Sequence, residues 1–137
     1  MSSKNRPKVY LKDILEAINK IEKYTQNIGE VKFYASDIVI DVVIRNLEII
    51  GEATKKLPQE IKETYPQVPW KDMAGMRDVL IHDYSGVKLE IVWKTIKKEL
   101  PELKKRFRGF YRNYHKPKPF RAPISRPISL KRPSATS

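Results

Sequence analysis

Apolar residues recur at steps of three and four positions along most of the chain, a spacing that matches the helical repeat. One stripe covers residues 11–28 and is closed by Gly29, and a second follows the candidate caps Ser36 and Asp37 and continues to Pro58. A short helix over 58–64, a helix over about 71–82 and a last stripe over 89–103 follow. No segment shows the two-residue alternation that is typical of a strand. The sequence therefore predicts an all-α, up-and-down bundle of four to five helices.

The C-terminal part of the chain is basic and rich in proline. The chain carries a net charge of +12, and eight of its 28 Lys and Arg residues, but none of its 16 acids, follow residue 107. Five of the ten prolines also lie there, so this segment cannot bury enough surface to offset the entropy of ordering. We expect a folded domain over 1–111, with Pro101 kinking or restarting its last helix, and a disordered basic tail over 112–137. This tail is either a solvated appendage or an arm that attracts RNA electrostatically.

The composition excludes several classes of function. A chain of 137 residues with 40% hydrophobic residues fits one domain. It contains no cysteine, which excludes disulfides, thiolate metal sites and cysteine nucleophiles and favours a cytoplasmic location. The N-terminus has no apolar signal segment, and no apolar run approaches the roughly 20 residues of a membrane-spanning helix. We therefore expect a protein that acts in the cytoplasm and not at a membrane.

The segment GMRDVLIHDYSGV, residues 75–87, places Arg77, His82 and Tyr84 close together along the chain. On a straight helix Arg77 and Tyr84 lie nearly on one face, whereas His82 lies about 140° away. Gly86 and the polar residues before it suggest that the helix ends near His82, where a histidine can tilt across the helix end and its charged form is favoured by the dipole. The three side chains then meet at one helix end or across a symmetric dimer. From these residues alone, a packed histidine and an Arg–Tyr stack remain the alternative.

Five segments resemble the HepT-like ribonuclease toxins of the HEPN superfamily. They are YLKDILEAI at 10–18, VIRNLEIIGEATKKLP at 43–58, the tryptophan at 70, GMRDVLIHDYSGV at 75–87 and VWKTIKKELPELK at 92–104. Their order is that of the family from about Val9 to Phe107, and R-x4-H-x-Y is the signature motif of the family. The wider superfamily places a polar residue, usually Asn, after the arginine. Asp78 meets this pattern as an acid, and its charge is expected to weaken RNA binding slightly. The resemblance implies a HEPN-like helical bundle.

The resemblance also implies the toxin of a type VII toxin–antitoxin system, a metal-independent endoribonuclease that acts as a homodimer with its motifs facing across a cleft. The chemistry agrees with the residues. RNA cleavage without a metal uses the ribose 2′-OH as nucleophile and needs a base, an acid and a cation beside the phosphate. His82 near neutral pH serves the proton transfers, and Arg77 serves as the phosphate clamp. A dimer supplies two such histidines at one interface.

A regulatory role for Tyr84 follows from the same resemblance. Such toxins are neutralised when an MntA-type nucleotidyltransferase antitoxin transfers AMP from ATP to the motif tyrosine. The added phosphodiester carries negative charge and bulk to the neighbourhood of Arg77, where it competes with the substrate phosphate. No cofactor is implied for the ribonuclease itself.

Other polar residues give weaker signals. Arg45 lies in the family-like part of an apolar helix, where it either pairs with Asp41 or, together with Asp78, is a supporting or RNA-binding residue of the site. The carboxylate pairs at four-residue spacing, such as Glu48 and Glu52, have no histidine nearby, so we expect no metal site. Two alternatives remain open. One is a helical binding module without catalytic activity that complexes a nucleotidyltransferase-like partner, and the other is a nonspecific nucleic-acid binder that acts through the tail.

Overall fold

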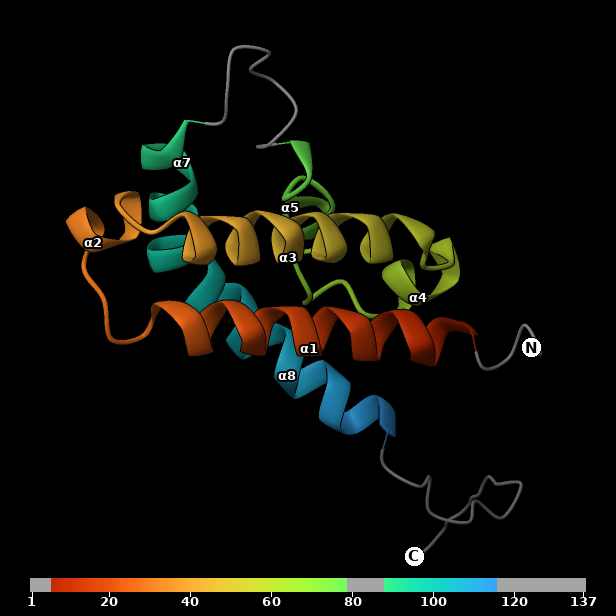
Figure 1. Cartoon of the computed structure of the whole chain (residues 1–137). Coiled ribbons are helices and arrows are strands. Elements are labelled where there is room, and N and C mark those ends of the chain that lie inside the picture. Colours follow the sequence, from red (N-terminus) through yellow and green to blue (C-terminus); the bar gives the residue numbers. More distant parts are fainter. Residues whose placement is uncertain (1–5, 79–87, 116–137) are drawn as a thin grey trace, which may run out of the picture.

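The computed structural model describes residues 6–78 and 88–115, and the elements within them are helical (Figure 1). These two ranges contain no strand, which confirms the all-α prediction. Within them, no helix is both long enough and apolar enough to cross a membrane.

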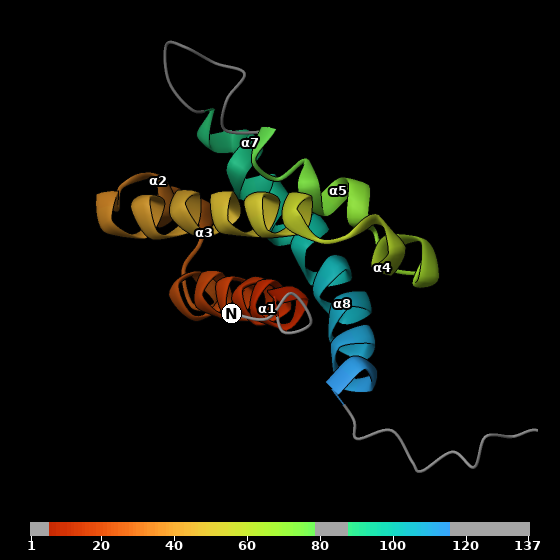
Figure 2. The ribbon, with the colours of Figure 1, turned by 90° about the vertical axis from the view of Figure 1, so that its right-hand side faces the viewer.

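The core is built on two long antiparallel helices, α1 (Arg6–Thr25) and α3 (Asp37–Lys56), which lie side by side in Figures 1 and 2. The short helix α2 (Glu30–Tyr34) lies between them in the chain. Apolar positions three and four residues apart on both long helices are fully buried in one core, and each such side chain contributes on the order of 2 kcal/mol. They include Leu11, Ile14, Ile18 and Ile21 of α1 and Val43, Leu47 and Ile50 of α3.

Local sequence sets both ends of α3. The Val39 backbone N–H donates a hydrogen bond to the Ser36 Oγ at 3.3 Å, as expected of a helix cap. The helix ends where Leu57 adopts an extended conformation, because a residue before proline avoids the helical region. The short helix α4 (Gln59–Thr64) follows at once. These ends agree with the positions that the sequence predicts.

The predicted helix over 71–82 is interrupted at residues 75–77, and Asp78 is helical again. The helix α5 covers Trp70–Ala74, and residues 75–77 form turns. The Asp78 backbone N–H donates to the Gly75 carbonyl oxygen at 2.9 Å, a three-residue spacing in place of the four-residue spacing of an α-helix. Glycine has a low helix propensity and favours this break. The remainder of the predicted helix lies outside the described residues.

The last elements form one continuous helical rod that crosses the α1 and α3 pair (Figures 1 and 2). It consists of α7 (Leu89–Lys94), a wider π-helical turn (Thr95–Glu99) and α8 (Leu100–His115). The wide turn comes just before Pro101, whose nitrogen has no hydrogen to donate to the carbonyl four residues earlier. The irregularity predicted at Pro101 therefore begins before the proline, and the helix does not end there.

The helix α8 extends further than the sequence suggests. The tail is predicted to begin at residue 112, whereas residues 112–115 are helical. The ring centroid of Tyr114 lies 5.5 Å from that of Phe110 and 6.3 Å from that of Tyr65, so aromatic packing stabilises the last turn. The rest of the predicted tail, residues 116–137, lies outside the described residues.

Candidate functional site

Arg77 lies in the turn that follows α5, and the close approach of this turn to α3 depends on Gly51. A Cβ atom at residue 51 would lie 2.6 Å from the Arg77 Cβ, 2.8 Å from the Arg77 backbone nitrogen and 3.1 Å from the Ala74 carbonyl oxygen. The first two distances are shorter than Cβ atoms tolerate, so a glycine is needed at this contact. Gly51 therefore fixes how close Arg77 lies to α3.

The next residue of α3, Glu52, holds the Arg77 guanidinium. The Arg77 Nη1 lies 2.8 Å from the Glu52 Oε2, and the two side chains are 39% and 43% exposed. A pair this exposed contributes at most about 1 kcal/mol to stability, because water screens the attraction. The main effect of the ion pair is therefore to orient the Arg77 guanidinium. The guanidinium stays partly open to solvent, where an anion can reach its N–H groups.

Arg77 and Glu52 border a groove along α3. The groove has a volume of about 270 Å³, and it is also lined by Arg45, Glu48 and Ile49. Arg45 lies about two helical turns before Glu52, on the same face of α3. The structure thus brings two of the residues predicted from the sequence, Arg45 and Arg77, to one groove. Two guanidinium groups at one groove suit a phosphodiester chain, which offers an anionic oxygen pair at each nucleotide.

Asp78 does not line this groove. Its Oδ1 lies 3.5 Å from the Lys55 Nζ of α3, and both side chains are about half exposed. Asp78 borders a second groove of about 440 Å³ that Lys71 and Glu99 also line. The two supporting residues predicted from the sequence, Arg45 and Asp78, therefore line different grooves.

Comparison with known proteins identifies the family. A family model described as Ribonuclease HepT-like matches residues 14–108. The chain belongs to this HepT-like family. The probable ribonuclease HepT of Thermococcus cleftensis is 47% identical over 104 residues, which cover 76% of this chain and 94% of that protein. A putative RNase of Methanocaldococcus jannaschii is 48% identical over 100 residues, 73% of this chain and 83% of the relative.

A further relative is a longer protein. The gamma-glutamylcyclotransferase and putative RNase of Methanocaldococcus jannaschii is 50% identical over 97 residues, which cover 71% of this chain but 44% of that protein. The chain thus spans less than half the length of this relative. No solved structure matches the chain significantly.

The HepT-like match includes the whole R-x4-H-x-Y motif, but His82 and Tyr84 lie outside the described residues. That their side chains lie close to Arg77 therefore stays a prediction. In the part of the chain that the structure describes, no three His, Asp or Glu side chains gather as a metal site requires.

Gly51 and Glu52 are residues of this candidate site that the sequence pattern did not connect with Arg77. A glycine inside a helix costs about 1 kcal/mol relative to alanine, so its presence within the apolar α3 is a signal of close backbone approach. Glu52 stands four residues after Glu48, and this spacing suggested a carboxylate pair in place of an arginine partner. Its contact with Arg77 depends on how the turn after α5 packs on α3, which no local spacing encodes.

Proposed function

We propose that the chain is an endoribonuclease that cleaves RNA without a metal ion, with Arg77 and His82 as its catalytic residues. The observation that carries this proposal is the half-exposed Arg77 guanidinium, which Glu52 fixes at a groove that Arg45 also lines. Membership of the HepT-like family supports it, since relatives across most of the chain are named ribonucleases.

The proposed reaction begins with attack of a ribose 2′-OH on the adjacent phosphorus. The bond from phosphorus to the 5′-oxygen of the next nucleotide breaks, which leaves a 2′,3′-cyclic phosphate and a free 5′-OH. A base takes the proton of the 2′-OH, and an acid gives a proton to the leaving 5′-oxygen. His82 carries out these transfers, with one histidine from each of two copies. Arg77 stabilises the negative charge that builds up on the phosphate.

Glu52 acts in this proposal as a positioning residue for Arg77. Because the ion pair is exposed, a substrate phosphate can approach the guanidinium without breaking a buried pair, which would be far more costly. The carboxylate limits the rotamers of the arginine before substrate arrives, so less side-chain entropy is lost on binding.

A second copy of the chain completes the site along the exposed face of α3. Ile38 is 72% exposed, and the half-buried Val42 and Ile49 continue the stripe at spacings close to the helical repeat. This apolar stripe leads to the groove that Arg77 lines, since Ile49 belongs to both. Two-fold pairing along the stripe covers its apolar surface and brings the two grooves together.

The proposed biological role is that of a toxin under the control of a nucleotidyltransferase antitoxin, which transfers AMP to Tyr84. The added phosphodiester competes with the substrate phosphate for Arg77. Intact mass after incubation with the nucleotidyltransferase and ATP tests this role. Wild type is expected to gain AMP and lose cleavage, whereas Tyr84→Phe keeps cleavage and gains no mass. AMP on the variant, or an unchanged cleavage rate of modified wild type, would contradict the role of Tyr84.

The decisive experiment for the activity compares Arg77→Ala and His82→Ala with Arg106→Ala on a short RNA in the presence of EDTA. Arg106 is a matched control, because it is also an exposed arginine held by a carboxylate, with its Nε 3.2 Å from the Glu102 Oε2 on α8. We expect the first two variants to fold and to lose cleavage by about 10²-fold or more. Arg106→Ala is expected to cleave as wild type does and to leave the same 2′,3′-cyclic product.

Two outcomes would overturn this function. Full activity of His82→Ala, or strict dependence on Mg²⁺, contradicts the mechanism. A wild-type chain that cleaves no RNA but still binds the nucleotidyltransferase points to the binding module without catalytic activity.

A further inference from the structure

An exposed glycine within α8 has no structural explanation in the described chain. Gly109 is exposed, and a Cβ atom added there would meet no atom within 4 Å, in contrast to Gly51. A glycine within a helix costs about 0.5–1 kcal/mol relative to alanine. Nothing in the described fold offsets this cost. A missing side chain does, however, let another molecule approach the helix backbone closely.

The residues around Gly109 are cations. Lys105, Arg108 and Arg112 are exposed, and none of them forms an ion pair with another described residue. At 100° per residue, these three side chains lie within about 60° of one another around α8, and Gly109 lies beside them on the same face. The single acid of α8, Glu102, pairs with Arg106, and the sequence contains no acid after it.

This face is distinct from the Arg77 groove and lies partly beyond the family match. The family match ends at residue 108, so Gly109 and Arg112 lie beyond it. In Figures 1 and 2, the C-terminal half of α8 lies at the bottom of the view, whereas α5, which leads to Arg77, lies nearer the top. A molecule that contacts both places must therefore extend across the protein.

We propose that the α8 face formed by Lys105, Arg108, Gly109 and Arg112 binds the phosphate backbone of a structured RNA, at a distance from the site of cleavage. The inference rests on the proposed ribonuclease function and deepens it, because it assigns the chain a preference for long, folded substrates. Three cations match a chain of phosphates, and the glycine lets the strand lie against the helix. Among the described residues, no large hydrophobic side chain of α8 is exposed, so the face lacks the apolar surface of a membrane-binding helix.

Salt dependence and substrate length follow from this geometry. Each phosphate that a cation neutralises releases counterions, so three contacts account for about 2 to 3 units of the slope of log affinity against log salt concentration. We expect a hexanucleotide bound at the Arg77 groove to offer too few phosphates to contact the α8 face as well. The α8 face is therefore expected to contribute to the binding of a hairpin and not to that of a hexanucleotide.

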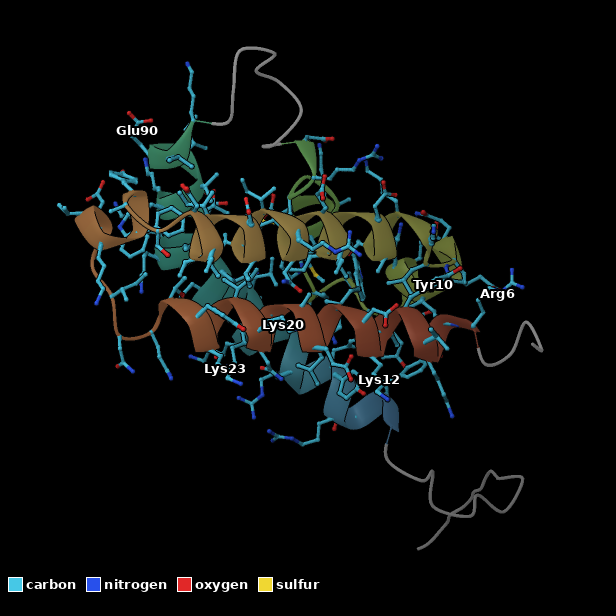
Figure 3. The ribbon with its side chains drawn as sticks, in the orientation of Figure 1. Arg6, Tyr10, Lys12, Lys20, Lys23 and Glu90 are labelled. Atoms are coloured by element: carbon cyan, nitrogen blue, oxygen red, sulfur yellow. The ribbon has the colours of Figure 1, made fainter. Side chains whose placement is uncertain are left out.

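The test compares two triple variants that remove the same charge. The first neutralises the α8 face through Lys105→Gln, Arg108→Gln and Arg112→Gln. The control neutralises three exposed lysines of α1, labelled in Figure 3, through Lys12→Gln, Lys20→Gln and Lys23→Gln. Unlike the α8 face, α1 carries acids between its lysines. Binding of a fully 2′-O-methylated hairpin and a fully 2′-O-methylated hexanucleotide is measured by fluorescence anisotropy, since neither probe has the 2′-OH that cleavage needs.

The α8 variant is expected to bind the hairpin about tenfold more weakly at low salt and to lower the salt slope by about 2. Its affinity for the hexanucleotide and its cleavage of an unmodified hexanucleotide are expected to stay at the wild-type level. The α1 control is expected to change hairpin binding by less than about twofold. Gly109→Ala is expected to weaken hairpin binding while it raises Tm, because alanine favours the helix but keeps the strand at a distance.

Three results would overturn the inference. Equal losses of hairpin binding in the two triple variants mean a general effect of charge. Unchanged hairpin binding in the α8 variant and in Gly109→Ala shows that the α8 face does not bind RNA. Unchanged RNA binding together with lost binding to anionic lipid vesicles assigns the face to a lipid surface. The proposed ribonuclease function is tested separately: it fails if the wild-type protein does not cleave unmodified RNA.

Discussion

Replacing Gly51 by alanine is expected to destabilise the fold and to displace Arg77 at the same time. The added methyl group would lie 2.6 Å from the Arg77 Cβ and 2.8 Å from the Arg77 backbone nitrogen, well inside van der Waals contact. A backbone atom cannot rotate away as the end of a long side chain can. The whole turn that carries Arg77 must therefore move away from α3.

Two opposing terms set the size of the effect. Overpacking costs about 1–3 kcal/mol, and the contact with backbone atoms places this substitution near the upper end. The better helix propensity of alanine returns about 1 kcal/mol. The net loss of about 1–2 kcal/mol lowers Tm by roughly 4–16 °C for a domain of this size. Because a misplacement of about 1 Å can reduce a rate about 10²-fold, RNA cleavage is expected to fall more than stability does.

The assay combines thermal unfolding, followed by circular dichroism, with cleavage of a short RNA at a temperature where both proteins are folded. Gly109→Ala is the matched control, because the same substitution there meets no atom within 4 Å. It is expected to raise Tm and to leave cleavage of the short RNA unchanged. A Gly51→Ala variant that melts at or above the wild-type Tm and cleaves at the wild-type rate would refute the reasoning.

Further predictions concern single features of the chain. Glu52→Gln is expected to change the free energy of unfolding by less than about 1 kcal/mol, because the ion pair is exposed, and to lower kcat for RNA cleavage; a wild-type kcat would exclude the positioning role. A hydrogen bond to the Glu30 carboxylate raises the pKa of Tyr34 to about 12. The folded state thus favours the neutral phenol, and this stabilisation is present below pH 10 and lost as the pH rises from 10 to about 12. Urea unfolding across this range is expected to show a larger loss in wild type than in Tyr34→Phe, which keeps Tyr114, whose pKa is also raised by burial, and identical curves would contradict it. Ile38→Asp is expected to give a monomer by light scattering that cleaves poorly, and an intact dimer would exclude the α3 stripe as the interface. Deletion of 116–137 is expected to leave Tm unchanged and to weaken RNA binding mainly at low salt, whereas a large fall in Tm would mean that this segment stabilises the bundle.

Features that depend on near neighbours in the chain were predictable from the sequence. The helical repeat gave the cores of α1 and α3, because burial of one face needs no knowledge of the partner helix. The Ser36 cap and the end of α3 before Pro58 also depend on adjacent residues alone. The same is true of Arg77 as a candidate, since the motif that singles it out is continuous.

Features that depend on packing between distant segments were not predictable in this way. The helical repeat continues past Gly75, and the low helix propensity of one glycine does not show that the chain turns there to lie against α3. The end of α8 was misplaced for a related reason. The composition after residue 107 indicates a tail, but Tyr114 packs on Phe110 and on Tyr65 of a distant segment, and the helix continues.

The turn at residues 75–77 also changes how the motif is to be understood. Arg77 is not part of α5 itself, and its position is set by its contact with Gly51 and its ion pair with Glu52. In the proposed function, the single helix α3 therefore makes three contributions to the site. Gly51 contacts the catalytic arginine, Glu52 is its carboxylate partner, and Arg45 is the second cation. The proposed dimer stripe lies on the same helix and shares Ile49 with the groove. A substitution that shifts α3 at the interface is then expected to shift the groove as well, so dimerisation and cleavage should be lost together and not one at a time.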